Sequence, residues 1–130
     1  MRAQHPDAGT VLVWGNNLFG QLGLGDRKAR LSPQRVPDLP PAGRVTAGEY
    51  FSAILTSTWC AGVRGEVTQL THTHPSAGGQ LFVFGYNGYG QLGLGDKKHR
   101  LTPQAMPAPA AGGWKAVEAG EAFMVATTGG

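Results

Sequence analysis

The sequence has little of several features that define common classes of protein. Its single cysteine, Cys60, cannot form an internal disulfide, so a secreted disulfide scaffold is excluded. Charged residues make up only 15% of the chain, against 41% apolar residues, a balance typical of a globular β protein. No apolar run approaches the length of a membrane span, and no signal-peptide core follows Met1. We therefore expect no membrane association and an intracellular protein, cytoplasmic or nuclear.

Glycine, by contrast, is abundant, with 21 residues in 130. It follows no three-residue period, which argues against collagen and indicates tight turns between short strands. The formal net charge is +3 and the pI about 9.4, which permits an acidic partner without requiring one.

An internal repeat organises the chain. Residues 11–37 (VLVWGNNLFGQLGLGDRKARLSPQRVP) return as residues 81–107 (LFVFGYNGYGQLGLGDKKHRLTPQAMP), with 16 of 27 positions identical. Residues 47–51 match residues 119–123 in the same way. The chain thus divides into an N-terminal tail (1–10), a first repeat (11–56), an inserted segment (57–78) and a second repeat (79–130).

Each repeat has the pattern of short strands joined by turns. Residues 11–14 and 81–84 are apolar runs that end at a glycine, and they predict buried strands. An extended segment follows Pro33 or Pro103, and two further strands complete each unit. Four strands in about 50 residues are typical of a propeller blade. We predict an all-β fold with two four-stranded antiparallel blades of an incomplete β-propeller. The predicted core comprises Leu12, Trp14, Leu22, Leu24, Val45, Ile54, Phe82, Phe84, Leu92, Leu94, Val117 and Val125.

The repeated marks resemble a known family. WGxN (14–17), GQLGLGD (20–26), Pro33 and VTAG (45–48) stand in the order of the regulator-of-chromosome-condensation repeat, and the second repeat carries the same marks. The resemblance implies a propeller that closes with about seven units, of which this chain has two. It also implies binding to a protein partner, such as a small GTPase or a chromatin-associated protein.

Motifs that suggest chemistry have simpler explanations. Residues 88–93 match the dinucleotide fingerprint, but a turn follows instead of a helix, and Leu18 breaks the pattern in the first repeat. His72 and His74 lack further ligands at a zinc-like spacing, and Cys60 has no identifiable base. We expect no enzyme, and no catalytic, cofactor-binding or metal-binding residues.

Two acidic residues and two basic clusters follow the glycine-rich segments. Asp26 and Asp96 are interpreted as turn residues whose carboxylates accept a backbone N–H two residues on. The basic clusters that follow them in sequence are residues 27–30 and 97–100. They are either solvated loops or a surface that binds an acidic protein face or phosphates. No aromatic residues interleave with these charges, so nucleic-acid binding has no further support. The candidate partner-binding residues are Arg27, Lys28, Arg30, Lys97, Lys98, His99 and Arg100.

Residues 57–78 have no counterpart in the repeat, and we expect an exposed loop. This segment is either a true insertion or translated intron, because residues 65–67 and 75–78 can be encoded by splice-like strings.

Three functions stay open. They are a protein-interaction module, guanine nucleotide exchange toward a small GTPase as part of a complete propeller, and an incomplete or mis-spliced gene product. Because two blades leave faces and strand edges uncovered, we expect marginal stability and self-association.

Overall fold

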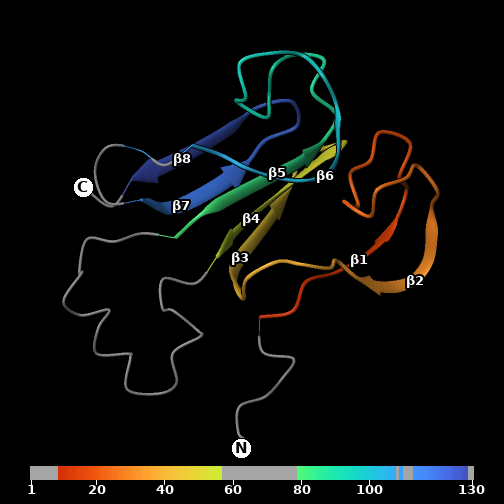
Figure 1. Ribbon diagram of the computed structural model, residues 1–130. Helices are drawn as coiled ribbons and strands as arrows, with labels where there is room; N and C mark the ends of the chain where they lie inside the picture. The colour runs from red at the N-terminus through yellow and green to blue at the C-terminus, as the bar shows by residue number, and fades with distance from the viewer. Residues whose placement is uncertain (1–8, 57–78, 108, 110–112, 129–130) are drawn as a thin grey trace, which may run out of the picture.

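The computed structural model describes residues 9–56, 79–107, 109 and 113–128 (Figure 1). Every regular element in these ranges is a β-strand. The inserted segment, with Cys60, His72 and His74, lies outside the described residues, as do residues 1–8 of the N-terminal tail. The strands are β1 (Leu12–Gly15), β2 (Arg30–Arg35), β3 (Ala42–Ala47), β4 (Phe51–Thr56), β5 (Leu81–Gly85), β6 (Arg100–Ala105), β7 (Trp114–Ala119) and β8 (Met124–Thr128).

The strands pair in antiparallel fashion into three sheets. One sheet has four strands in the order β3-β4-β5-β6, and it is flanked by the two-stranded sheets β1-β2 and β7-β8. The all-β propeller fold is confirmed, but the expectation of two complete four-stranded blades is wrong. The complete blade takes β3 and β4 from the first repeat and β5 and β6 from the second. The first two strands of a repeat therefore finish a blade that the preceding repeat begins.

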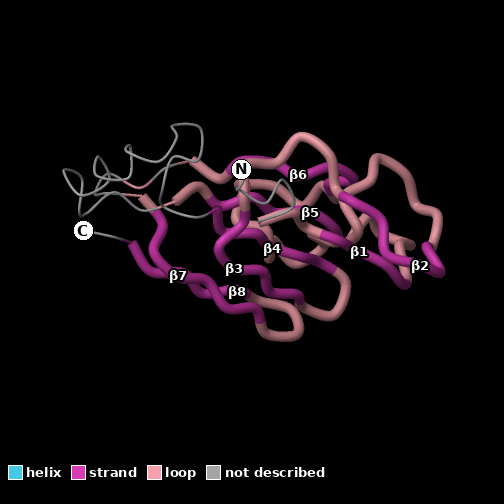
Figure 2. Tube along the Cα trace, turned by 90° about the horizontal axis from the view of Figure 1, so that it is seen from below, coloured by secondary structure: helices cyan, strands magenta, loops and turns pink. Residues whose placement is uncertain are grey.

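Each face of this central blade carries a buried apolar cluster. Side chains alternate between the faces of a strand, and in β4 Phe51, Ala53 and Leu55 pack toward Val117 of β7. Ile54 points to the opposite face, where the buried cluster also includes Val11 and Val36 of the β1-β2 side. Figures 1 and 2 show the two-stranded sheets on either side of the central blade, which makes three consecutive layers.

The predicted core is partly confirmed. Leu22, Ile54, Phe84, Leu92 and Val117 are buried, and Leu24, Phe82 and Leu94 are half-buried. The prediction is wrong for Leu12, Trp14, Val45 and Val125, which are each more than half exposed.

The exposed residues share a physical reason. Leu12, Trp14 and Val45 line an open groove of about 340 Å³ between β1 and β3. Two strands are needed to complete the blade of β1 and β2, and they would lie next to this groove. Val125 belongs to β8, which pairs with β7 alone among the described strands. Leu12, Trp14 and Val125 therefore belong to blades that are half built, whereas Val45 lies in β3 of the central blade and faces the half-built blade of β1 and β2.

Candidate partner-binding surface

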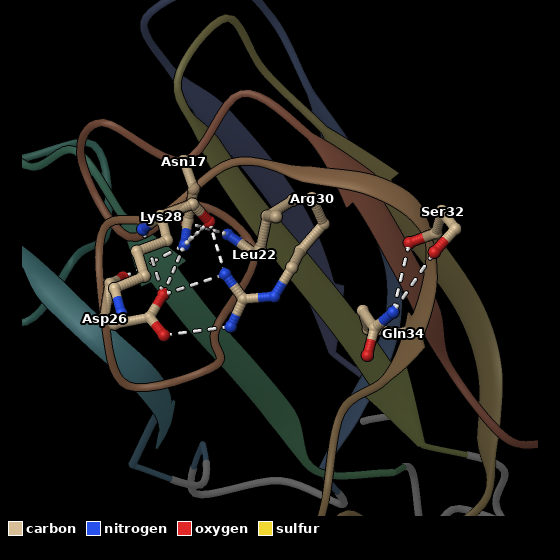
Figure 3. A network of polar contacts seen from close by, with 7 residues as sticks. All are labelled: Asn17, Leu22, Asp26, Lys28, Arg30, Ser32 and Gln34. Carbon is tan, nitrogen blue, oxygen red and sulfur yellow. Dashed lines mark hydrogen bonds and ion pairs between the residues drawn. The ribbon is translucent and has the colours of Figure 1, made fainter.

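Each glycine-rich segment forms a loop that is closed by one buried asparagine. We call residues 16–29 the first glycine loop and residues 86–99 the second. In the first, Asn17 Nδ2 donates to the backbone oxygens of Asp26 and Lys28, both at 3.0 Å, and to Asp26 Oδ1 at 3.1 Å (Figure 3). Asn17 Oδ1 accepts the Leu22 N–H at 2.9 Å. A fully buried amide with four partners fixes the loop without any regular structure.

Asp26 completes the loop as the sequence predicts. Its Oδ1 accepts the backbone N–H of Lys28 at 3.0 Å, which is the expected turn. Its two oxygens also receive Arg30 in a two-pronged ion pair, with Nη2 2.9 Å from Oδ2 and Nη1 3.2 Å from Oδ1. The Arg30 hydrogen bonds, with the Lys28 N–H, lower the pKa of Asp26 to about 2.

The second glycine loop repeats this geometry. Asn87 makes the same four hydrogen bonds, at 3.0 Å to Asp96 O, 3.1 Å to Asp96 Oδ1, and 3.0 Å to both Lys98 O and Leu92 N. Asp96 pairs with Arg100 at 2.9 Å, and its pKa is likewise lowered to about 2, chiefly by that arginine. The matching backbones predicted from the sequence are therefore confirmed in their hydrogen bonding.

The seven candidate partner-binding residues separate into two groups. Arg30 and Arg100 are committed to their aspartates. His99 Nδ1 accepts the backbone N–H of Asn87 at 3.0 Å, and its ring stacks against Tyr86 with centroids 4.8 Å apart. In the part of the chain that the structure describes, the exposed side chains of Arg27, Lys28, Lys97 and Lys98 form no ion pair or hydrogen bond.

The two loops are brought together by close packing on the central blade. Gly25 N donates to Leu101 O at 2.9 Å, and Phe19 packs against His99 with ring centroids 5.5 Å apart. At Gly20 a side chain would meet the Leu101 backbone at 2.9 Å, and its φ of +81° also favours glycine. The first glycine loop thus contacts His99, within the second basic cluster (residues 97–100), and Leu101, directly after it.

An aromatic pocket beside these loops was not predicted from the sequence. Phe19, Tyr50 and Tyr86 pack edge to face, with ring centroids 4.8 to 6.4 Å apart. With Tyr89 they line a hollow of about 180 Å³, whose rim includes Glu49 and Glu121. These residues are far apart in sequence. The one available signal was that Phe19 and Tyr89 both precede GQLG.

Other kinds of site find no support in the described ranges. No group of three or more His, Cys, Asp or Glu side chains lies there that could hold a metal ion. No helix in those ranges is both long and apolar enough to cross a membrane.

Comparison with known proteins identifies the repeat. The profile of the regulator of chromosome condensation (RCC1) repeat matches residues 8–55 and 78–127. The chain is 33% identical to the ultraviolet-B receptor UVR8 of Arabidopsis thaliana over 82% of its length, and 37% identical to the bovine (Bos taurus) secretion-regulating guanine nucleotide exchange factor over 74%. It covers 22% and 17% of those two proteins, so it spans less than a quarter of either.

Solved structures show the same fold. The crystal structure of human WBSCR16 superimposes with a TM-score of 0.71 at 17% identity, over 95% of this chain and 27% of that one. Yeast RCC1 (Prp20), in a crystal structure with Kap60 bound, gives 0.62 at 20% identity, over 92% and 26%. The chain belongs to the regulator of chromosome condensation (RCC1) repeat family.

Proposed function

We propose that this chain is part of a protein-interaction module and that its two glycine loops contact the partner. The module acts by binding and not by catalysis. It works as part of a larger propeller, because the two-stranded sheets β1-β2 and β7-β8, which we call the half-blades, need further strands to complete them.

The observation that carries this proposal is the contrast within the loops. Their interior is rigid, with an asparagine and an Asp–Arg pair satisfying each other. Their exposed cations, Arg27, Lys28, Lys97 and Lys98, are held outward on that rigid base. Binding through pre-formed loops loses little conformational entropy, and grouped cations favour an acidic protein surface.

Charge reversal tests the proposal. Lys28→Glu combined with Lys98→Glu changes the net charge by the same amount as Arg35→Glu combined with Lys115→Glu, on exposed strand positions. Each variant is placed in the complete gene product and used for quantitative affinity capture from cell extract. We expect the loop variant alone to lose specific partners, and the loss to resemble that caused by high salt in the unmodified protein. Equal capture by both variants would refute a role for the loops.

Guanine nucleotide exchange toward a small GTPase is a second candidate. It is favoured by the 37% identity to the secretion-regulating guanine nucleotide exchange factor. A nucleotide-release assay on a panel of small GTPases tests it with the complete gene product. Acceleration that disappears in the Lys28→Glu, Lys98→Glu variant is expected, and no acceleration at any protein concentration excludes it.

A further inference from the structure

The aromatic pocket has a composition that the loop cations do not explain. Three tyrosines and Phe19 line it, and the packed rings are inclined at 63° to 72° to one another. Rings at such angles present both faces and edges to the hollow. The face of an aromatic ring carries negative charge density and attracts cations.

Two carboxylates reinforce this preference. Glu49 N donates to Glu121 O at 3.2 Å, which brings the β3-β4 and β7-β8 turns together at the pocket. Both glutamates are exposed, and among the described residues neither carboxylate has an ion-pair partner. None of the described lining residues is basic, and the one basic ring that packs against two of them, Tyr86 and Phe19, is that of His99. Two carboxylates that line one hollow favour a cation there over an anion.

This negative site lies on a chain whose formal net charge is +3. The local charge is therefore opposite to the overall charge, and opposite to that of the exposed loop cations. The pocket and the basic clusters consequently favour different parts of a partner.

We propose that the aromatic pocket binds a methylated ammonium group carried by a lysine side chain of a partner protein. This proposal rests on the proposed interaction function and names one chemical group that the module recognises. A methylated ammonium is weakly hydrated and has few or no N–H donors. It is therefore matched by ring surfaces and nearby carboxylates better than by a hydrogen-bonding site.

The test is an NMR titration of the full 130-residue chain. The probes are Nα-acetyl-Nε-trimethyl-lysine amide, its unmethylated form, its uncharged isostere with a tert-butyl group, and choline. We expect the tyrosine ring signals to shift with the trimethyl-lysine probe, and the uncharged isostere to bind at least about threefold more weakly. Equal binding of the isostere, or no shift at about 50 mM probe, overturns the proposal. Tighter binding of choline than of trimethyl-lysine, or of unmethylated lysine than of the methylated probe, also overturns it.

Exposed residues supply variants that should fold normally. Tyr89→Ala, and Glu49→Gln combined with Glu121→Gln, should each weaken trimethyl-lysine binding at least about threefold. Asp38→Asn is the matched control, because it removes an exposed carboxylate outside the pocket at a left-handed position that asparagine tolerates. Unchanged binding by the pocket variants overturns the proposal. The proposed interaction function is tested separately, by the charge-reversal variant of the glycine loops, whose substitutions lie outside the pocket.

Discussion

The central blade and the half-blades are made of equivalent residues that differ in burial. Phe84 in the central blade is 0% exposed, whereas Trp14, which occupies the same place in the first repeat, is 59% exposed. Val117 of β7 packs against the complete central blade and is 1% exposed, whereas its equivalent Val45, in β3 of the central blade, faces the half-built blade of β1 and β2 and is 58% exposed. Residue type is apolar in every case. The core of a propeller blade is therefore completed by its neighbours, and a repeat alone cannot bury it.

The glycine loops show the opposite behaviour. The loop that packs on the complete blade and the loop beside the half-blade share the four hydrogen bonds of their buried asparagine, with distances equal to within 0.1 Å. Space around them differs: a side chain at Gly20 would strike Leu101, whereas nothing lies within 4 Å of one at Gly90. Local interactions determine the shape of the loops, and non-local packing determines the burial of the strands.

The largest expected effect separates the two equivalent aromatic positions. Phe84→Ala should lower the free energy of unfolding by about 3 to 5 kcal/mol, because it leaves a cavity between layers. Trp14→Ala should cost less than about 1 kcal/mol, because most of the ring is already in water. Chemical denaturation of both variants measures the difference. Equal losses would mean that Trp14 is buried in solution, for example by association.

Adding the strands that complete a half-blade should bury its exposed apolar residues. In a tandem fusion of two copies, β8 of the first should pair with β1 of the second as β4 pairs with β5, placing Val125 opposite Val13 and Met124 opposite Trp14. Burial of the exposed apolar residues should add about 3 kcal/mol. A blue-shifted Trp14 fluorescence and a higher denaturation midpoint would report it. A fusion no more stable than the single chain would contradict this pairing.

At high concentration the single chain should self-associate through the same edges. Its melting temperature should then rise with concentration. A sharp monomeric transition that is independent of concentration would argue against the open edges.

The two loop asparagines should contribute equally to stability, although one loop packs on the complete blade and the other lies beside a half-blade. Asn17→Ala and Asn87→Ala should each cost about 2 to 3 kcal/mol, because each leaves buried backbone groups unpaired. Asn16→Ala is the matched control, since exposed Asn16 accepts one hydrogen bond, from the Leu18 N–H at 2.9 Å. Unequal losses at Asn17 and Asn87 would show that the loops depend on the blade beneath them.

Within the central blade, the connection between β4 and β5 should be dispensable. Thr56 N donates to Gln80 O at 2.9 Å, and Gln80 N donates to Thr56 Oγ1 at 2.8 Å, so the two strand ends already adjoin. Replacing residues 58–78 with Asn-Gly, a common hairpin turn, should raise the free energy of unfolding by about 1 kcal/mol through a shorter loop. A large loss on denaturation would indicate that the replaced residues pack on the fold.

The smallest expected effect is a loss of stability at low pH. The pKa values of Asp26 and Asp96 are lowered from 3.8 to about 2 in the folded chain, so the unfolded chain binds protons first as the pH falls. Stability should be full above pH 4 and should decline between about pH 4 and 2. The midpoint of denaturation against pH measures it, and the decline should shrink in high salt. Asp26→Asn with Asp96→Asn should flatten the profile, and an unchanged profile would assign the acid response to other groups.

The features that could be predicted from the sequence are those that local interactions determine. The turn at Asp26 and the matching loops were predictable, because their partners lie within eleven residues. The strands β1 and β5 were predictable from apolar runs that end at glycines. The extended segments expected to start at Pro33 and Pro103 instead begin three residues earlier, at Arg30 and Arg100. The pairing of β4 with β5 was not, because a periodic sequence has the same pattern wherever a blade begins.

The aromatic pocket could not be predicted for a related reason. Phe19 and Tyr86 lie in different repeats, and their contact depends on how the first glycine loop packs on the central blade. The exposure of Trp14 was hidden in the same way, since its apolar pattern matches that of buried Phe84. Contacts between repeats appear only when the blades are placed in space.

The offset between repeat and blade also bears on how such a protein grows. Since β4 and β5 join two repeats within one sheet, every whole repeat added by duplication inserts one complete blade. The outermost strands keep the same character, with a β7-β8 type pair at one end and a β1-β2 type pair at the other. A gene of this kind can gain or lose a period by recombination and still produce two ends that fit each other.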